Sequence, residues 1–104
     1  MSVEKQKAES YYVSHPNHSF SVFFINEIGD LFITGDWGDY SYTWRRYGND
    51  FKEFLTGLNE EYFCSKISIN YNNQHLKSPS KSKLKSVWQL FALLQEELRK
   101  ETNL

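Results

Sequence analysis

The sequence holds a single cysteine, no long run of apolar residues and almost no net charge. One cysteine, Cys64, permits neither an intramolecular disulfide nor a cysteine-built metal site, so the composition favours a reducing compartment such as the cytoplasm. We expect Cys64 to be a small buried hydrophobe. No stretch approaches 18 consecutive apolar residues, and the first ten residues, MSVEKQKAES, are polar. The sequence therefore predicts no membrane-spanning helix and no secretory signal.

The short motifs of common catalytic and nucleotide-binding sites are also missing. The sequence has no P-loop, GxGxxG, GxSxG or HExxH pattern and no EF-hand loop. His15 and His18 would need His75 and a fourth ligand to hold a metal ion. Asp36 and Asp39 have no His, Ser or Cys close by in the sequence to share acid–base work. We therefore predict that the protein is not an enzyme and uses no metal or cofactor.

Aromatic residues, by contrast, are abundant. They make up 17% of the chain, and fifteen of the eighteen lie between Tyr11 and Phe63. Because disordered chains are poor in aromatics, residues 1–104 are predicted to form one small folded domain. The net charge of −1 argues against a polycation that wraps nucleic acid and against an acidic nucleic-acid mimic.

The pattern of apolar residues predicts an α+β fold. We expect a small antiparallel sheet of three to four strands that packs against two short helices and one long C-terminal helix. In order, the predicted segments are a flexible tail, a β-meander, two short helices, a polar loop and a long helix, at residues 1–8, 9–46, 49–67, 68–82 and 83–101. Residues 20–26 read as a strand with both faces apolar. Either Asn49 or Asp50 is the candidate N-cap of the first short helix, and Asn59 starts the second.

Charge is unevenly distributed along the chain. Residues 27–61 hold eight acidic and three basic residues, whereas residues 62–104 hold seven basic and three acidic ones. The basic half contains a cluster at the predicted loop and helix start, Lys77, Lys81, Lys83 and Lys85. This cluster is either a nucleic-acid patch or an ordinary solvated loop, and four lysines are few for strong nucleic-acid affinity.

The most distinctive segment is GDWGDY at residues 35–40. Trp37 between two glycines is either an exposed anchor for a partner or a side chain folded back over the sheet edge. We expect a basic partner surface to meet the acidic groups around this loop, together with two arginines that can grip a carboxylate or phosphate. The candidate partner-binding residues are Glu27, Asp30, Asp36, Trp37, Asp39, Arg45 and Arg46.

Tyr40, Tyr42 and Trp44 alternate with polar residues and share one strand face. This face is either a platform on which bases stack or the core side of the sheet. The core is the favoured interpretation, because the helices need a surface to pack on.

The segment GDWGDYSYTW at residues 35–44 is followed by Gly48, by FKEFL at 51–55 and by YFCSKI at 62–67. These features resemble small accessory proteins of tailed phages and prophages. Such proteins have a hydrophobic hairpin, a G-D-[aromatic]-G-x-[aromatic]-x-[aromatic]-x-W segment, an F-x-x-F-L helix and a Tyr-rich helix that ends in Lys-Ile. The resemblance covers residues 20–67 and carries over no functional residue.

The resemblance implies a counter-defence protein that binds and inhibits a host protein in the bacterial cytoplasm, most specifically an anti-CRISPR protein that binds a CRISPR-Cas effector. The alternatives are a nucleic-acid-binding phage accessory protein and a small-molecule sponge with an aromatic pocket. Trp88, Leu90 and Leu93 give the last helix more apolar surface than one face needs. This surplus predicts a homodimer through the helix at 83–101.

Overall fold

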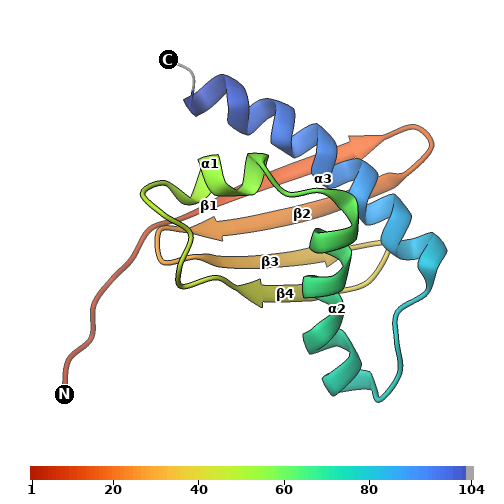
Figure 1. Ribbon diagram of the computed structural model, residues 1–104, viewed down its shortest axis with the longest axis horizontal. Helices are drawn as coiled ribbons and strands as arrows, with labels where there is room; N and C mark the ends of the chain where they lie inside the picture. The colour runs from red at the N-terminus through yellow and green to blue at the C-terminus, as the bar shows by residue number, and fades with distance from the viewer. Residues whose placement is uncertain (103–104) are drawn as a thin grey trace.

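The computed structural model describes residues 1–102, so the last two residues of the predicted 1–104 domain, Asn103 and Leu104, lie outside the described residues. Figure 1 shows four strands followed by three helices along this part of the chain. The elements are β1 (Ala8–His15), β2 (Ser19–Asn26), β3 (Asp30–Gly35), β4 (Tyr40–Thr43), α1 (Phe51–Thr56), α2 (Glu60–His75) and α3 (Lys81–Thr102).

The four strands form one antiparallel meander in the order β1-β2-β3-β4. The predicted α+β class is therefore confirmed, and the sheet has four strands. β1 pairs with β2 over its whole length, from Ala8 opposite Asn26 to His15 opposite Ser19. It begins one residue earlier than predicted, and Pro16 follows its last residue.

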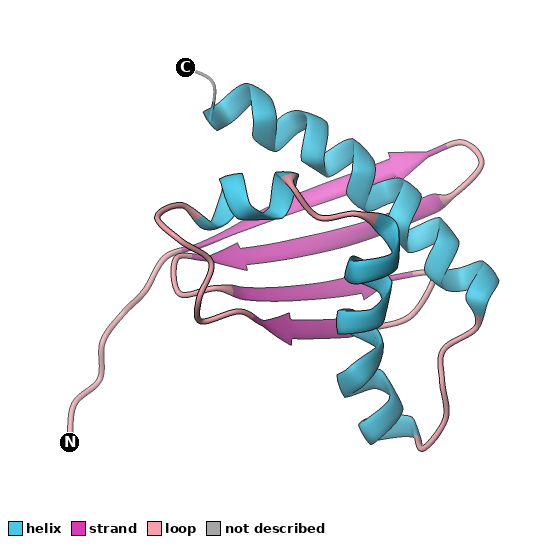
Figure 2. Ribbon diagram, in the orientation of Figure 1, coloured by secondary structure: helices cyan, strands magenta, loops and turns pink. Residues whose placement is uncertain are grey.

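All three helices lie on the same side of the sheet (Figure 2). α3 crosses β1 and β2, α2 packs on β4, and α1 packs on α3. The core between the sheet and the helices includes the fully buried side chains Phe23, Leu31, Phe63 and Phe91. The rings of Phe63 and Phe91 stack with centroids 4.1 Å apart. A chain of this size thus fills one core with aromatic side chains on one side of the sheet.

The predicted polar loop at 68–82 is wrong over most of its length. α2 is a 16-residue helix that continues to His75, and only residues 76–80 connect it to α3. The physical reason is tertiary contact: Tyr71 stacks on Tyr40 with ring centroids 5.3 Å apart, and Asn70 donates to the Ser41 carbonyl. These contacts stabilise a helical turn that the polar sequence alone does not predict.

The apolar surplus of α3 is used inside the chain. Leu90 is fully buried, and Trp88 is half-buried against Phe63 and Phe91. Leu93 keeps 36% of its surface exposed. The homodimer stays a prediction, but the surface on which it rested packs mainly within one copy. Within residues 1–102, no helix is long and apolar enough to cross a membrane.

The turn between β2 and β3 closes tightly on the end of β4. The Gly29 carbonyl accepts a hydrogen bond from the Trp44 backbone N–H at 2.8 Å. Gly29 has φ +93°, and a Cβ atom there would lie 1.7 Å from the Trp44 carbonyl oxygen. Only glycine fits this position, because it lacks the Cβ that would collide and it tolerates positive φ.

Candidate binding surface

The side of the sheet that faces away from the helices carries large apolar side chains. Because side chains alternate along a strand, Phe23 and Ile25 point into the core while Val22 and Phe24 point to the opposite side. We call this side the open face and define it by five residues: Tyr12, Phe20, Val22, Phe24 and Phe32. A solvated sheet face usually carries polar residues, so this aromatic surface is unusual.

The strand register places these side chains next to one another. Phe24 lies directly opposite Phe32, and Tyr12 lies opposite Val22. The rings of Tyr12 and Phe20 stack with centroids 5.2 Å apart. Tyr12 is 68% exposed, Phe32 53% and Phe24 38%. The open face is therefore a continuous apolar surface across β1, β2 and β3.

The predicted partner residues did not include the open face. The available signal was the strand at residues 20–26, which is apolar on both faces although a helix layer needs only one of them. The prediction that Tyr40, Tyr42 and Trp44 belong to the core is confirmed. Tyr40 and Trp44 are 3% and 7% exposed, and Tyr42 is half-buried against Trp44.

Trp37 folds back onto the protein. Its side chain is half-buried against the core, and its Nε1 donates to the His18 carbonyl at 2.5 Å. Its own carbonyl accepts from the Tyr40 hydroxyl at 2.6 Å. Asp36 and Asp39 on either side of it are exposed. Of this loop, the two carboxylates rather than the indole are therefore exposed, and their binding to a partner stays a prediction.

The structure does not bring all of the candidate partner residues together. The β3–β4 loop with Asp36, Trp37 and Asp39 lies at one end of the meander, beside the β1–β2 turn (Figure 1). The β2–β3 turn and the segment after β4 lie at the other end and carry Glu27, Asp30, Arg45 and Arg46. Acidic groups thus stand at both ends of the open face.

Asp30 is held by three neighbours. It accepts from Asn26 Nδ2 and Thr43 Oγ1, both at 2.8 Å, and from Arg45 Nη1 at 3.0 Å. Partial burial raises the pKa of Asp30, but these hydrogen bonds outweigh burial and hold it below its usual value. Arg45 is largely exposed, so this ion pair contributes little to stability. Through these three hydrogen bonds Asp30 connects the end of β2, β4 and the segment after β4 where the open face ends.

The lysine cluster belongs to the helix layer rather than to the open face. Lys77 lies in the connection after α2, and the other three, Lys81, Lys83 and Lys85, lie in the first turns of α3. All four are exposed. Whether they bind nucleic acid stays a prediction.

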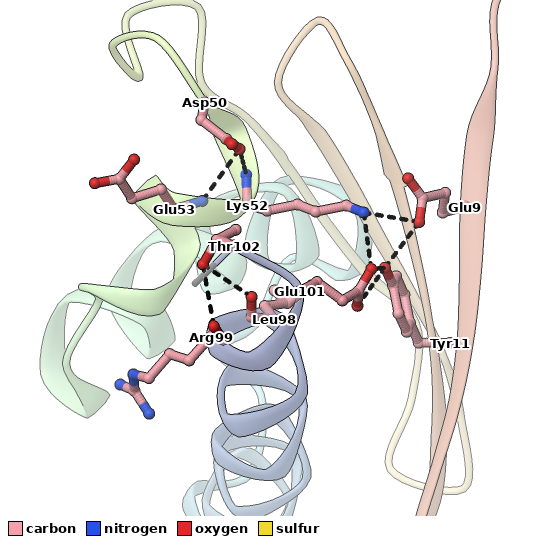
Figure 3. A network of polar contacts seen from close by, with 9 residues as sticks. All are labelled: Glu9, Tyr11, Asp50, Lys52, Glu53, Leu98, Arg99, Glu101 and Thr102. Atoms are coloured by element: carbon pink, nitrogen blue, oxygen red, sulfur yellow. Dashed lines mark hydrogen bonds and ion pairs between the residues drawn. The ribbon is translucent and has the colours of Figure 1, made fainter. Parts of the chain in front are cut away.

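A second polar cluster joins β1, α1 and α3 (Figure 3). Lys52 Nζ lies 2.9 Å from Glu9 Oε2 and 3.1 Å from Glu101 Oε1. The Tyr11 hydroxyl donates to both carboxylates. The hydrogen bonds from Lys52 and Tyr11 lower the pKa of Glu9, and burial with the Glu9 contact raises the pKa of Tyr11 to about 12. We call these four residues the Lys52 cluster.

Next to the Lys52 cluster, residues 5–9 and α1 border an open groove of about 780 Å³. Its lining mixes lysines with Glu9, Glu27 and Asp50, and Tyr47 and Phe51 are its aromatic residues. The volume suits a small molecule, but the mixed charge favours no particular ligand.

The histidines and the cysteine show no arrangement for chemistry. Among residues 1–102, no group of three or more His, Cys, Asp or Glu side chains is placed to hold a metal ion. His15 and His18 lie side by side with ring centroids 5.1 Å apart. Burial, with a contribution from Glu60, raises the pKa of the Cys64 thiol to about 11, so the reactive thiolate is scarce. That the protein is not an enzyme stays a prediction.

Comparison with known proteins gives one finding. A family model described as a phage family matches residues 1–103, nearly the whole chain. No curated protein and no solved structure matches the chain. The match supports the predicted phage accessory protein and covers more of the chain than residues 20–67, while the sequence motif behind that resemblance stays a prediction. The chain belongs to this phage protein family.

Proposed function

We propose that this phage protein is a counter-defence accessory protein that binds a host protein through the open face and inhibits it in the bacterial cytoplasm. The observation that carries the proposal is the aromatic sheet face that the helices leave uncovered. Contiguous exposed apolar surface on a small protein is typical of a protein-binding site. The resemblance to phage accessory proteins favours a CRISPR-Cas effector as the target, which makes the protein an anti-CRISPR.

The charges around the open face favour a protein partner over nucleic acid. None of the strand residues of β1–β4 that point to this side is a lysine or arginine. Asp36 and Asp39 are exposed at one end of it, whereas at the other end Asp30 is paired with Arg45 and Arg46 is exposed. A nucleic-acid surface needs cations to neutralise phosphates, and the carboxylates of Asp36 and Asp39 would repel these phosphates. The expected partner therefore combines an apolar centre with a basic rim.

A host effector that binds nucleic acid matches this description, because the groove in which such an effector holds nucleic acid is basic. The open face would bury its aromatic side chains against the partner, while Asp36 and Asp39 pair with lysines or arginines at the groove's rim. Binding there excludes the nucleic acid by occupying its place.

The capture experiment compares three forms of the protein in lysate from the phage's host. The open-face variant Phe24→Ser/Phe32→Ser removes two exposed rings that lie opposite each other. The control Ile69→Ser removes a side chain of similar exposure, 43%, from α2. We expect wild type and control to retain the same host protein after nuclease treatment and the open-face variant to lose it. Capture that persists in the open-face variant, or that nuclease abolishes, contradicts the proposal.

Inhibition is measured separately as phage plating on a CRISPR-immune host. We expect wild type and Ile69→Ser to restore plaque formation and Phe24→Ser/Phe32→Ser to leave it at the level of the empty vector. Equal protection by all three forms would show that the open face does not carry the activity. Circular dichroism and thermal melting of each form exclude unfolding as the cause.

A further inference from the structure

A small groove adjoins the open face where the β4 edge of the sheet meets α2. Its lining includes Phe24 and Phe32 of the open face together with Asp39, Asn70 and Gln74. Its volume is about 250 Å³. Pockets for whole small-molecule ligands measure roughly 300–1,000 Å³. The groove is therefore sized for one side chain of a partner rather than for a separate ligand.

The lining of this β4-edge groove includes hydrogen-bond acceptors of Asp39, Asn70 and Gln74. Asp39 Oδ1 accepts from Thr34 Oγ1 at 2.6 Å, which leaves Oδ2 available. Asn70 Nδ2 donates to the Ser41 carbonyl at 3.0 Å and to Ser41 Oγ at 3.3 Å, so the acceptor Oδ1 is the polar atom of this side chain left for a ligand. Gln74 adds a second amide from the last turn of α2. The groove thus calls for a group that carries several donors.

Two further features favour a positive charge. α2 ends at His75, so Gln74 lies in the helix's last turn, where the unpaired carbonyls carry partial negative charge. Asp39 carries a full negative charge at the same place, and Asp36 is exposed in the same loop. Burial raises the pKa of the neighbouring Tyr40 to about 12, with further contributions from Tyr71, Asp39 and Cys64.

We propose that the β4-edge groove receives an arginine side chain of the partner protein, with its guanidinium between Asp39 and the ring of Phe32. This inference rests on the proposed function, because the arginine belongs to the protein bound at the open face. A guanidinium offers five donors in one plane, which matches the acceptors of Asp39, Asn70 and Gln74. The same plane stacks on an aromatic face. A lysine ammonium has three donors and no plane, so it fills this site less well.

The test uses three capped amino acids as probes at constant ionic strength: acetyl-arginine amide, acetyl-lysine amide and acetyl-citrulline amide. Citrulline has the shape of arginine without the charge. Binding is followed by ¹H–¹⁵N NMR, in which the side-chain amides of Asn70 and Gln74 report directly. We expect saturable shifts at the groove with arginine, weaker binding of lysine by about threefold or more, and no saturation with citrulline.

Two carboxylate variants of the same loop form a matched pair. Asp39→Asn and Asp36→Asn remove the same charge, but only Asp39 lines the groove. We expect Asp39→Asn to raise the Kd of the arginine probe at least about fivefold. Asp36→Asn should change it less than about twofold, because exposed charges outside the groove are screened. Equal effects of the two variants, or shifts spread over the whole surface, overturn the inference.

The failure of this inference and the failure of the proposed function give different results. Host protein captured through the open face, with no preference of the groove for arginine, removes the groove inference alone. Arginine-specific binding in the groove, with no protein lost by Phe24→Ser/Phe32→Ser, removes the proposed partner and leaves a guanidinium site. Weaker capture by Asp39→Asn than by Asp36→Asn supports both.

Discussion

Gln95 is the one polar side chain of α3 that is buried in the core, and its replacement offers a quantitative test of the packing. Its side chain is 4% exposed. Its Nε2 donates to the Leu55 and Leu58 carbonyls, both at 2.9 Å. The Leu55 carbonyl lies in the last turn of α1 and the Leu58 carbonyl just beyond it, where the regular hydrogen bonds of the helix have ended. Gln95 therefore caps α1 from the neighbouring helix.

The replacement Gln95→Met keeps the side-chain length and removes both donors. An acceptor left without a partner in a buried site costs about 1–3 kcal/mol. The Leu55 carbonyl keeps a weak bond from the Leu58 N–H at 3.3 Å, and the Leu58 carbonyl is only partly buried. Neither carbonyl therefore loses all of its hydrogen bonding. We expect the free energy of unfolding to fall by about 2 kcal/mol in total, which is well below the cost of two buried acceptors without partners.

The assay is equilibrium urea unfolding, with thermal melting as a second readout. For a chain of this length, 1 kcal/mol corresponds to about 5 °C, so the melting temperature should fall by about 10 °C. The control is Arg99→Met, which removes an exposed donor to the Thr56 carbonyl and should cost less than about 0.5 kcal/mol. If Gln95→Met is as stable as wild type, the buried hydrogen bonds do not hold α1 in place.

Three further predictions test local features. Gly29→Ala should lower the free energy of unfolding in urea by more than about 3 kcal/mol, because the new Cβ collides with the backbone. Gly48 has a similar φ but open space around it, so Gly48→Ala should lower the free energy of unfolding by only about 1 kcal/mol. Equal losses in the two variants would refute the collision. Because the pKa of Glu9 is lowered in the folded protein, the ionised Glu9 stabilises the fold at pH values above the ordinary glutamate pKa. This stabilisation is lost as the pH falls through the lowered pKa. Lys52→Met removes its main cause, so the urea midpoint of this variant should fall less in acid than that of wild type. Cys64 should react with iodoacetamide about 100-fold more slowly than a thiol of pKa 9.0, since its pKa is about 11, and a normal rate at pH 8 would contradict its burial.

The features that follow from local sequence were predictable. Asp50 caps α1 by accepting from the Lys52 and Glu53 backbone N–H groups, and Asn59 caps α2 by accepting from the Tyr62 N–H. Both are residues whose short side chains suit a helix start. The β-meander within the predicted range 9–46 likewise follows from apolar runs that turn residues separate. Local chemistry decides these elements, so a single sequence contains them.

The second half of α2 was not predictable for the opposite reason. Its residues are mainly asparagines and other polar side chains, without an apolar stripe of helical period. Its helical state depends on Tyr71 against Tyr40, a contact between residues 31 positions apart. Tertiary contact overrides weak propensity here, and a pattern search along the chain does not detect it.

The open face escaped prediction because two faces of β2 compete for the core. The inward side carries Phe23 and Ile25, and the outward side carries Val22 and Phe24. The two pairs are about equally hydrophobic, so hydrophobicity does not predict which face of β2 is buried. The apolar stripe of α3 decides it, because Phe91 packs against Phe23. The partner residues around Trp37 were chosen by composition, and composition does not reveal that the indole bonds back to His18.

The open face and the core make separate demands on the sequence. The open side of the sheet already carries polar residues at Ser10, Ser14 and Ser41, so this fold accepts them there. Phe24 lies directly opposite Phe32, and a cross-strand pair contributes about 0.2–1 kcal/mol. Phe24 is 38% and Phe32 53% exposed, so part of each ring lies in water, where it adds a risk of aggregation. An aromatic surface at positions where the fold accepts polar residues, and which lowers solubility, supports the proposed binding site, and we expect Phe24→Ser/Phe32→Ser to lower the stability without unfolding the protein.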